Sequence, residues 1–311
     1  MAVSGSFDYN NTATELVKDA LEYCGKQDRA QTVNADDAES CRKTFNMMMK
    51  FWQAREIGLW LTNTITLFLE KDAQSYDIYS SGAHATTDFT KTEIATAGSS
   101  TDLTIDVDSI SGILDGDYIG IELDDGTLQW TTVDGDPAVT TVTINDALDD
   151  DVSVNAHVYA YTTKAEKPLE LIDVQLFQSS ETEYPVNIIT RDEYKRLADK
   201  KSVGKAVQAY SDFRIDRMTL HLWPTADSVK DYLVFSAKRR IDDIDSLSNN
   251  AALPPEWLLP MSTNLAYWVA PKFGCSTEKI AILKAYADET LQALMMFDQE
   301  DTPFTIEPQT R

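Results

Sequence analysis

The residue types most often used in catalysis and metal binding are sparse in this chain and lie far apart. His84, His157 and His221 show neither the H-x-x-x-H nor the H-x-x-E spacing, and no G-x-S-x-G, P-loop or G-x-G-x-x-G motif occurs. His221 alternates with Leu220 and Leu222, as in a half-buried strand, so we assign it a structural role and expect His84 and His157 at the surface. The sequence therefore predicts no catalytic, cofactor-binding or metal-binding residue.

Acidic clusters raise the question of a calcium site. The run from Asp106 to Gly112 resembles the start of an EF-hand loop, but glycine stands at position seven rather than six, and Asp117 replaces the bidentate glutamate of position twelve. Asp149 to Asp151 form a run of like charges, which usually faces water. We favour solvated loops at both places and keep calcium as the alternative.

One basic stretch stands out against the acidic background. Between Arg191 and Lys205, six cations meet three anions. An exposed turn is one interpretation, and contact with phosphate or with an acidic protein surface is the other, because long Lys and Arg side chains suit both partners. The candidate contact residues are Arg191, Lys195, Arg196, Lys200, Lys201 and Lys205.

The overall charge narrows the class of protein. The 311 residues include 51 Asp and Glu against 27 Lys and Arg, and the net charge of −24 argues against a protein that wraps nucleic acid. No apolar run approaches the ~18 residues of a membrane span, and the first residues lack a secretion signal. Cys24, Cys41 and Cys275 cannot all pair, which favours a reducing compartment. We expect a soluble protein without membrane contact.

Residues 86–164 differ from the rest of the chain in charge and in periodicity. They contain sixteen carboxylates against Lys91 and Lys164, and their Thr- and Val-rich runs alternate with a period of two between turn-forming clusters. Asp124-Asp125-Gly126 predicts a hairpin turn. We expect an inserted all-β module, a barrel or a sandwich, that folds independently and has closely spaced ends.

The flanking segments alternate between helical and strand patterns. A capping box of Thr12 and Glu15 begins one helix that Gly25 ends, and Asn34 begins a second helix that Gly58 ends. Two more helices are expected after Pro254 and after Ser276, and the tryptophans at 52, 60, 257 and 268 are expected in the core. The expected strands cover 65–71, 169–177, 206–215, 218–223 and 232–237.

The predicted fold class is α+β. A helical bundle from the N- and C-terminal helices packs on a β-rich middle segment, because each terminal helix has one apolar stripe that needs a partner. The predicted domains are a discontinuous core of 1–85 and 165–297, the inserted acidic β module of 86–164, and an extended tail of 298–311. The tail has few apolar residues and two prolines, so we expect it to become ordered on a partner.

The order of these features resembles a known family. The segments that carry the resemblance are ELVKDALEYCG, DDAESCRKTFNMMMKFWQAREIGLW, ITRDEYKRLADKKSVGKAVQAY, MTLHLWPTADS and LPPEWLLPMSTNLAYWVAPKFG. Over roughly 10–80 and 165–300 the chain is similar to head-to-tail adaptors of short-tailed double-stranded DNA bacteriophages, also called tail accessory factors or head completion proteins. The acidic β module departs from the smallest members, which are mainly helical.

The resemblance implies a structural virion protein rather than an enzyme, without a cofactor. Such adaptors form a ring, usually of twelve subunits, that joins the portal protein to the tail nozzle or to fibre and spike proteins, and they assemble in the bacterial cytoplasm. Double-stranded DNA passes through the ring without sequence recognition, and acidic walls suit this because they repel phosphate. The implied portal-binding residues of the tail are Pro303, Phe304, Thr305, Ile306, Pro308 and Arg311.

Two other functions stay open at this stage. The β insert could make the chain an adhesion or decoration protein that binds a fibre, a spike or a host glycan. Some proteins of the family are associated with peptidoglycan hydrolysis, which requires a pair of carboxylates ~5 to 9 Å apart. With 51 acidic residues such a pair arises by chance, so the sequence does not discriminate.

Overall fold

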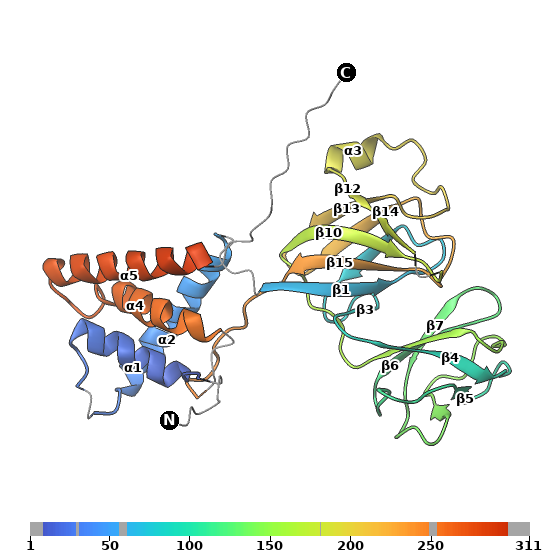
Figure 1. Ribbon diagram of the computed structural model, residues 1–311, viewed down its shortest axis with the longest axis horizontal. Coiled ribbons are helices and arrows are strands. Elements are labelled where there is room, and N and C mark those ends of the chain that lie inside the picture. Colours follow the sequence, from blue (N-terminus) through green and yellow to red (C-terminus); the bar gives the residue numbers. More distant parts are fainter. Residues whose placement is uncertain (1–8, 29–30, 56–60, 181, 249–253, 298–311) are drawn as a thin grey trace, which may run out of the picture. The chain divides into compact units, whose positions relative to one another are not determined.

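The computed structural model describes residues 9–28, 31–55, 61–180, 182–248 and 254–297, and it divides the chain into two compact units (Figure 1). The helical unit combines both ends of the chain, up to Leu61 and from Ile241 onward. The β unit comprises Thr62–Arg240. The structure is thus mixed α+β, with a β-rich middle and terminal helices. None of the helices in the described ranges is long and apolar enough to cross a membrane.

The helical unit is built around one central helix. Its elements are α1 (Ala13–Cys24), α2 (Ala35–Gln53), the 3-10 turn η2 (Pro255–Trp257), α4 (Leu258–Val269) and α5 (Thr277–Phe297). Helix α4 packs against α1, α2 and α5 and buries residues on nearly all sides. Its buried Asn264 is satisfied by hydrogen bonds to the carbonyls of Pro260, at 2.9 Å, and Ala287, at 3.2 Å. Each surrounding helix therefore buries apolar side chains against α4.

Helix ends follow the local sequence closely. Thr12 and Glu15 form the predicted capping box, and Gly25 ends α1 in the left-handed conformation with φ of 71°. The Asn34 side chain accepts a hydrogen bond from the backbone N–H of Asp36 at the start of α2. These three predictions are confirmed, whereas the predicted helix end at Gly58 lies outside the described residues.

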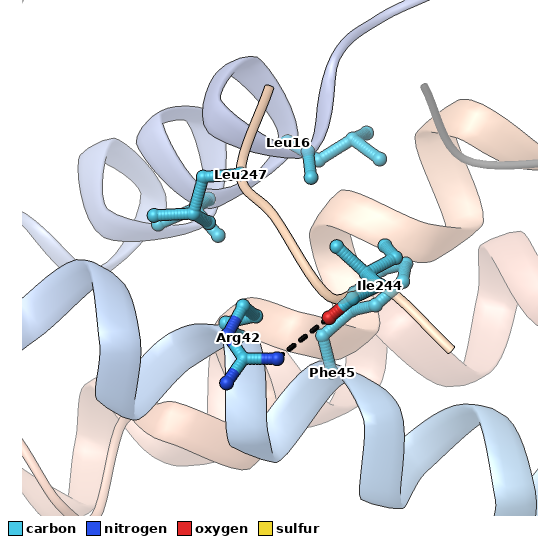
Figure 2. A pocket seen from close by; sticks show the side chains of 7 residues that line it. Leu16, Arg42, Phe45, Ile244 and Leu247 are labelled. Carbon is cyan, nitrogen blue, oxygen red and sulfur yellow. Dashed lines mark hydrogen bonds between the residues drawn. The ribbon is translucent and has the colours of Figure 1, made fainter. Parts of the chain in front are cut away.

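An extended segment, residues 241–247, leads from the β unit into the helical unit and packs between α1 and α2 (Figure 2). Three side chains at four-residue spacing on α2 bind its carbonyls. Arg42 and Asn46 donate to the Ile244 carbonyl at 2.7 and 3.1 Å, and the Lys50 ammonium donates to the Ile241 carbonyl at 2.7 Å. The apolar gap around Ile244 is too small for a water molecule, so it is a packing site rather than a ligand pocket.

Two sheets of the β unit share one hydrophobic core. The five-stranded sheet has the order β11-β10-β15-β1-β3, and the four-stranded sheet has the order β12-β13-β14-β2. Both contribute to one cluster of buried residues that includes Leu67, Ile78, Leu220, Leu233 and Phe235. The strands and the short helix are β1 (Thr62–Phe68), β2 (Ser75–Ile78), β3 (Ala85–Thr86), β10 (Glu170–Phe177), β11 (Glu183–Pro185), β12 (Asn187–Ile188), α3 (Arg191–Arg196), β13 (Gln208–Phe213), β14 (Met218–Trp223) and β15 (Tyr232–Lys238).

The acidic segment forms a third sheet with a core of its own. Its order is β7-β6-β9-β4-β5-β8, and Val133, just after β7, pairs with Ile144, just after β8, so that the two edges of the sheet meet. The predicted hairpin turn is confirmed, because Gly126 adopts φ of 79° between β6 and β7. The strands are β4 (Thr90–Thr96), β5 (Thr104–Val107), β6 (Tyr118–Glu122), β7 (Leu128–Thr132), β8 (Thr141–Thr143) and β9 (His157–Tyr161).

The compact units differ from the expected domains. The ends of the acidic segment are close together, since the Ala165 N–H donates to the Ala85 carbonyl at 2.6 Å. The unit boundaries, however, fall after Leu61 and after Arg240. The expected core of 1–85 and 165–297 placed the helices over strands, whereas the helical cluster contains only residues of the helices and of their flanking segments. The physical reason is that α4 supplies the apolar surface that the sequence interpretation had assigned to the strands.

Candidate interaction surfaces

The basic segment begins with a short helix that the sequence specifies locally. Thr190 and Glu193 form a capping box at the start of α3, and the buried ring of Tyr194 stacks on Tyr210 with centroids 5.5 Å apart. The Trp223 indole N–H donates to the Asp199 carbonyl at 2.7 Å, which ties the following loop to the end of β14. These two contacts hold α3 and the loop that follows it against β13 and β14.

The six candidate cations do not act alike. The Lys200 ammonium donates to the carbonyls of Lys195 and Leu197 at the end of α3, so its charge stabilises that helix end. Arg191 lies 3.9 Å from Asp212, and Lys205 lies over the Tyr184 ring. Lys195, Arg196 and Lys201 are exposed. Contact with phosphate or with an acidic surface remains a prediction for this segment.

The predicted portal-binding residues Pro303, Phe304, Thr305, Ile306, Pro308 and Arg311 lie outside the described residues.

Most carboxylates of the acidic segment accept hydrogen bonds from donors within the same segment. Asp117 accepts a hydrogen bond from the Leu114 N–H at 2.8 Å, and Asp106, in β5, accepts one from the Thr141 hydroxyl at 2.7 Å. Other carboxylates that accept in the same way are Asp102, Asp115, Glu122, Asp124, Asp125, Asp146 and Asp151. Among the described residues, no group of three or more His, Cys, Asp or Glu side chains could hold a metal ion. The residues that resemble the start of an EF-hand loop therefore form the end of β5 and a turn.

His84 is half-buried rather than at the surface, which corrects the prediction. Its ring stacks on Trp130 with centroids 3.9 Å apart and an interplanar angle of 4°. Its Nδ1 lies 2.6 Å from the Tyr161 hydroxyl. Burial lowers the pKa of His84 to about 3, and the nearby charge of Lys164 acts in the same direction. The imidazole is therefore neutral at pH 7 and serves as a packing group.

His157 is also half-buried, contrary to the prediction of a surface position. Its Nδ1 lies 3.6 Å from Glu93, and its backbone N–H donates to Glu122, which pairs with Lys230 at 2.9 Å. His221 lies in β14 and stacks on Tyr210 at 5.5 Å, which agrees with a structural role. Burial is the largest cause that lowers the pKa of each of these two histidines.

An aromatic cluster links the acidic sheet to the five-stranded sheet. Phe68, at the end of β1, is 2% exposed and lies at its centre, within 4.8 Å of Tyr159, 5.2 Å of Trp130 and 5.3 Å of Phe89 between ring centroids. Around them pack Tyr118, Leu128, Tyr161 and Tyr232. The sequence interpretation missed this cluster because its members come from strands far apart in the chain. In the sequence, the aromatic residues of AHVYAYTT were a sign of this cluster.

We expect His84 to make the stability of the β unit depend on pH. Its pKa is lower in the folded state than the ordinary 6.5, so the unfolded chain binds more protons below pH 6.5. The stabilisation is complete above pH 6.5 and is lost as the pH falls towards 3, by up to about 2 kcal/mol between pH 6.5 and 5. Urea unfolding at several pH values should therefore show a steeper loss for the natural chain than for His84→Gln. Equal slopes would contradict the burial of a neutral His84.

Comparisons with known proteins find little similarity. No protein-family model matches the chain, and no curated protein matches it. Among solved structures, a match is the Gp54 tailspike of Acinetobacter baumannii bacteriophage AP22, in complex with A. baumannii capsular saccharide. The TM-score is 0.22 with 19% sequence identity, over 26% of this chain and 16% of the tailspike chain. The chain thus spans less than a fifth of the length of that tailspike, and the match assigns neither a family nor a fold.

Proposed function

We propose that this protein is a structural component of a bacteriophage virion, an adaptor subunit that forms a ring between the portal and the tail and continues the DNA channel. The observation that carries the proposal is the helical unit, in which segments from both ends of the chain that resemble the adaptor family fold together. Helices α1 and α2 come from the N-terminal segments, and α4 comes from LPPEWLLPMSTNLAYWVAPKFG. Their mutual packing around α4 supports the view that the helical segments of the resemblance belong to one fold unit.

The net negative charge of the chain is compatible with the wall of a channel through which DNA passes. The net charge of −24 gives the chain an average repulsion for the phosphate backbone, and repulsion prevents a passing duplex from binding through counterion release. In the acidic segment, many carboxylates accept hydrogen bonds from nearby backbone N–H groups, so the same residues that give the charge also stabilise the turns. These carboxylates therefore have a structural role as well as giving the segment its charge.

Imaging of the purified full-length chain tests this proposal. In negative stain, the chain mixed with the portal protein of the same phage genome should add a ring at one end of the portal. Portal rings that look the same with and without the chain would refute the adaptor assignment. A loss of turbidity of cell walls on addition of the chain would instead support the hydrolase alternative.

Removal of the C-terminal tail is expected to abolish joining to the portal. Truncation after Phe297 keeps α5 complete, so we expect a folded chain with an unchanged helical circular-dichroism signal. A ring presents many copies of the tail, so loss of the tail removes the avidity of all of them. Phe304→Ala should weaken co-sedimentation with portal rings, while Gln309→Ala, in the same tail, is the matched control. Full co-sedimentation of the truncated chain would show that attachment lies elsewhere.

A further inference from the structure

Two cysteine side chains from distant parts of the chain meet in the helical unit. Cys24 is the last residue of α1, and Cys275 lies in the turn between α4 and α5. The Cys275 thiol lies 3.7 Å from the Cys24 carbonyl oxygen, although 251 positions separate the two residues. Figure 1 shows the end of α1 and this turn at the same end of the helical unit. The fold therefore brings together two cysteines that the sequence keeps far apart.

Both cysteines are anchored on the central helix α4. The Cys24 thiol donates to the Ala266 carbonyl of α4 at 3.3 Å, and Gly25 ends α1 directly after it, with φ of 71°. The Cys275 backbone N–H donates to the carbonyl of Ala270, at the end of α4, at 3.1 Å. Because one helix positions both residues, their side chains stay adjacent for as long as the helical unit is folded.

The two thiols also influence each other. Burial is the largest cause that raises the pKa of Cys24, to about 12, and the charge and hydrogen bonding of the Cys275 side chain are the next causes. Cys41, on α2, raises this pKa through its charge alone, and the Lys279 ammonium acts in the opposite direction. Cys275 is therefore the closer thiol partner of Cys24.

From this geometry we infer that Cys24 and Cys275 form a reversible disulfide bond when the chain meets a disulfide oxidant such as oxidised glutathione. Cys275 is partly exposed and reacts first, because its thiolate can attack a sulfur of the oxidant, which forms a mixed disulfide and releases one reduced glutathione. The Cys24 thiolate then attacks the Cys275 sulfur and releases the second. The two cysteines lose two electrons and two protons, and both end on the two glutathione molecules.

The bond fastens the N-terminal part of the helical unit to its C-terminal part, because it joins α1 to the turn between α4 and α5. Protein disulfides persist in oxidising surroundings and are kept reduced in the cytosol. A virion protein would thus be reduced during assembly and locked after release from the cell. This biological meaning rests on the proposed function, whereas the bond itself is a property of the purified chain. A chain that forms the bond but ignores the portal would refute the adaptor proposal alone.

Peptide mapping of the full-length chain tests the bond. The folded chain is incubated with oxidised glutathione, its remaining thiols are blocked with N-ethylmaleimide, and it is digested with trypsin without reductant. Each cysteine lies in a tryptic peptide of its own, 19–26, 30–42 or 273–279. We expect peptide 19–26 linked to 273–279, from a band of single-chain mass on a denaturing gel without reductant.

The unfolded chain provides an internal comparison. In urea, loop closure favours the short loop between Cys24 and Cys41 over the long loop between Cys24 and Cys275 by roughly sixtyfold. Oxidation of the unfolded chain should therefore link peptide 19–26 mainly to 30–42. A change of partner between the unfolded and the folded chain shows that the tertiary structure, rather than the sequence distance, selects Cys275.

Cys275→Ser should abolish the linked peptide and keep the helical circular-dichroism signal, because Cys275 is only partly buried. Cys41→Ala is the matched control, since it removes a cysteine but keeps both reacting thiols, and it should form the link. The oxidised natural chain should unfold at a higher urea concentration than the reduced chain, a shift that Cys275→Ser lacks. A folded chain without the link from 19–26 to 273–279, or linked mainly from 19–26 to 30–42, would overturn the inference. An oxidised chain with an unshifted urea midpoint would overturn the stabilising role of the bond.

Discussion

Phe68→Ala is expected to lower the free energy of unfolding of the β unit by about 3–5 kcal/mol, the range for removal of a large buried aromatic side chain. Phe68 is 2% exposed and contacts rings from both sides of the junction between two sheets, with centroids 4.8 Å away at Tyr159 and 6.4 Å away at Tyr232. Its removal leaves a cavity that cannot collapse easily, because the surrounding rings are held by strands of two different sheets.

Hydrogen exchange measured by mass spectrometry locates this effect. We expect protection to fall in β1, β9 and β15, the strands that carry Phe68 and its neighbours, while α1 and α4 keep theirs. Phe213→Ala is the matched control, since Phe213 lies in β13 of the same unit but is exposed. A cost below about 1 kcal/mol for Phe68→Ala would mean that the acidic sheet is not anchored through this cluster.

Trp52→Ala is expected to lower the stability of the helical unit by a similar amount, about 3–5 kcal/mol. Trp52 is 3% exposed at the end of α2, and its ring lies 6.0 Å from that of Trp257, which precedes α4. The substitution removes contacts between the N-terminal and C-terminal parts of the chain, which are the two halves of this unit.

The test is the same hydrogen-exchange measurement, but here the helices rather than the strands are expected to lose protection. Protection should fall in α1, α2 and α4 and should stay unchanged in the β strands, because the helices share a cluster of their own. Leu259→Ala provides the control, since Leu259 lies on α4 but is exposed. A neutral effect of Trp52→Ala would place the α2 stripe outside the core.

The division of the chain into two units also decides how the stability of these variants must be measured. If the two units unfold separately, a single midpoint averages two free energies. Segment-resolved exchange keeps them apart. If Phe68→Ala and Trp52→Ala lowered protection in the same segments, the two units would unfold together.

Of the candidate sites, the sequence singled out the basic segment but could not assign the role of each cation. Lys195, Arg196 and Lys201 are exposed as predicted, whereas Lys200 binds carbonyls at the end of α3. Composition cannot separate these cases, because a lysine at a helix end and a lysine on a free surface look alike until the backbone is placed. The same holds for His84, which has a polar neighbourhood in sequence and an aromatic one in space.

What the sequence determined by itself is local. The ends of α1, the start of α2, the hairpin at Gly126 and the strand β14 (Met218–Trp223) were all predicted from residues within a few positions of one another. A capping box or a left-handed glycine acts on the backbone of its own turn, and the alternation of apolar residues acts within one strand. Such features hold whatever the rest of the chain does.

What only the tertiary structure decided is which apolar surface meets which. The stripe on α1 required an apolar partner, but nothing within α1 specifies that the partner is α4, some 240 residues later, rather than a strand. Hydrophobic burial is not directional, so many pairings satisfy one stripe and only the packing of the whole chain selects among them. For this reason the helices form their own unit, and Phe68 gathers rings from distant strands.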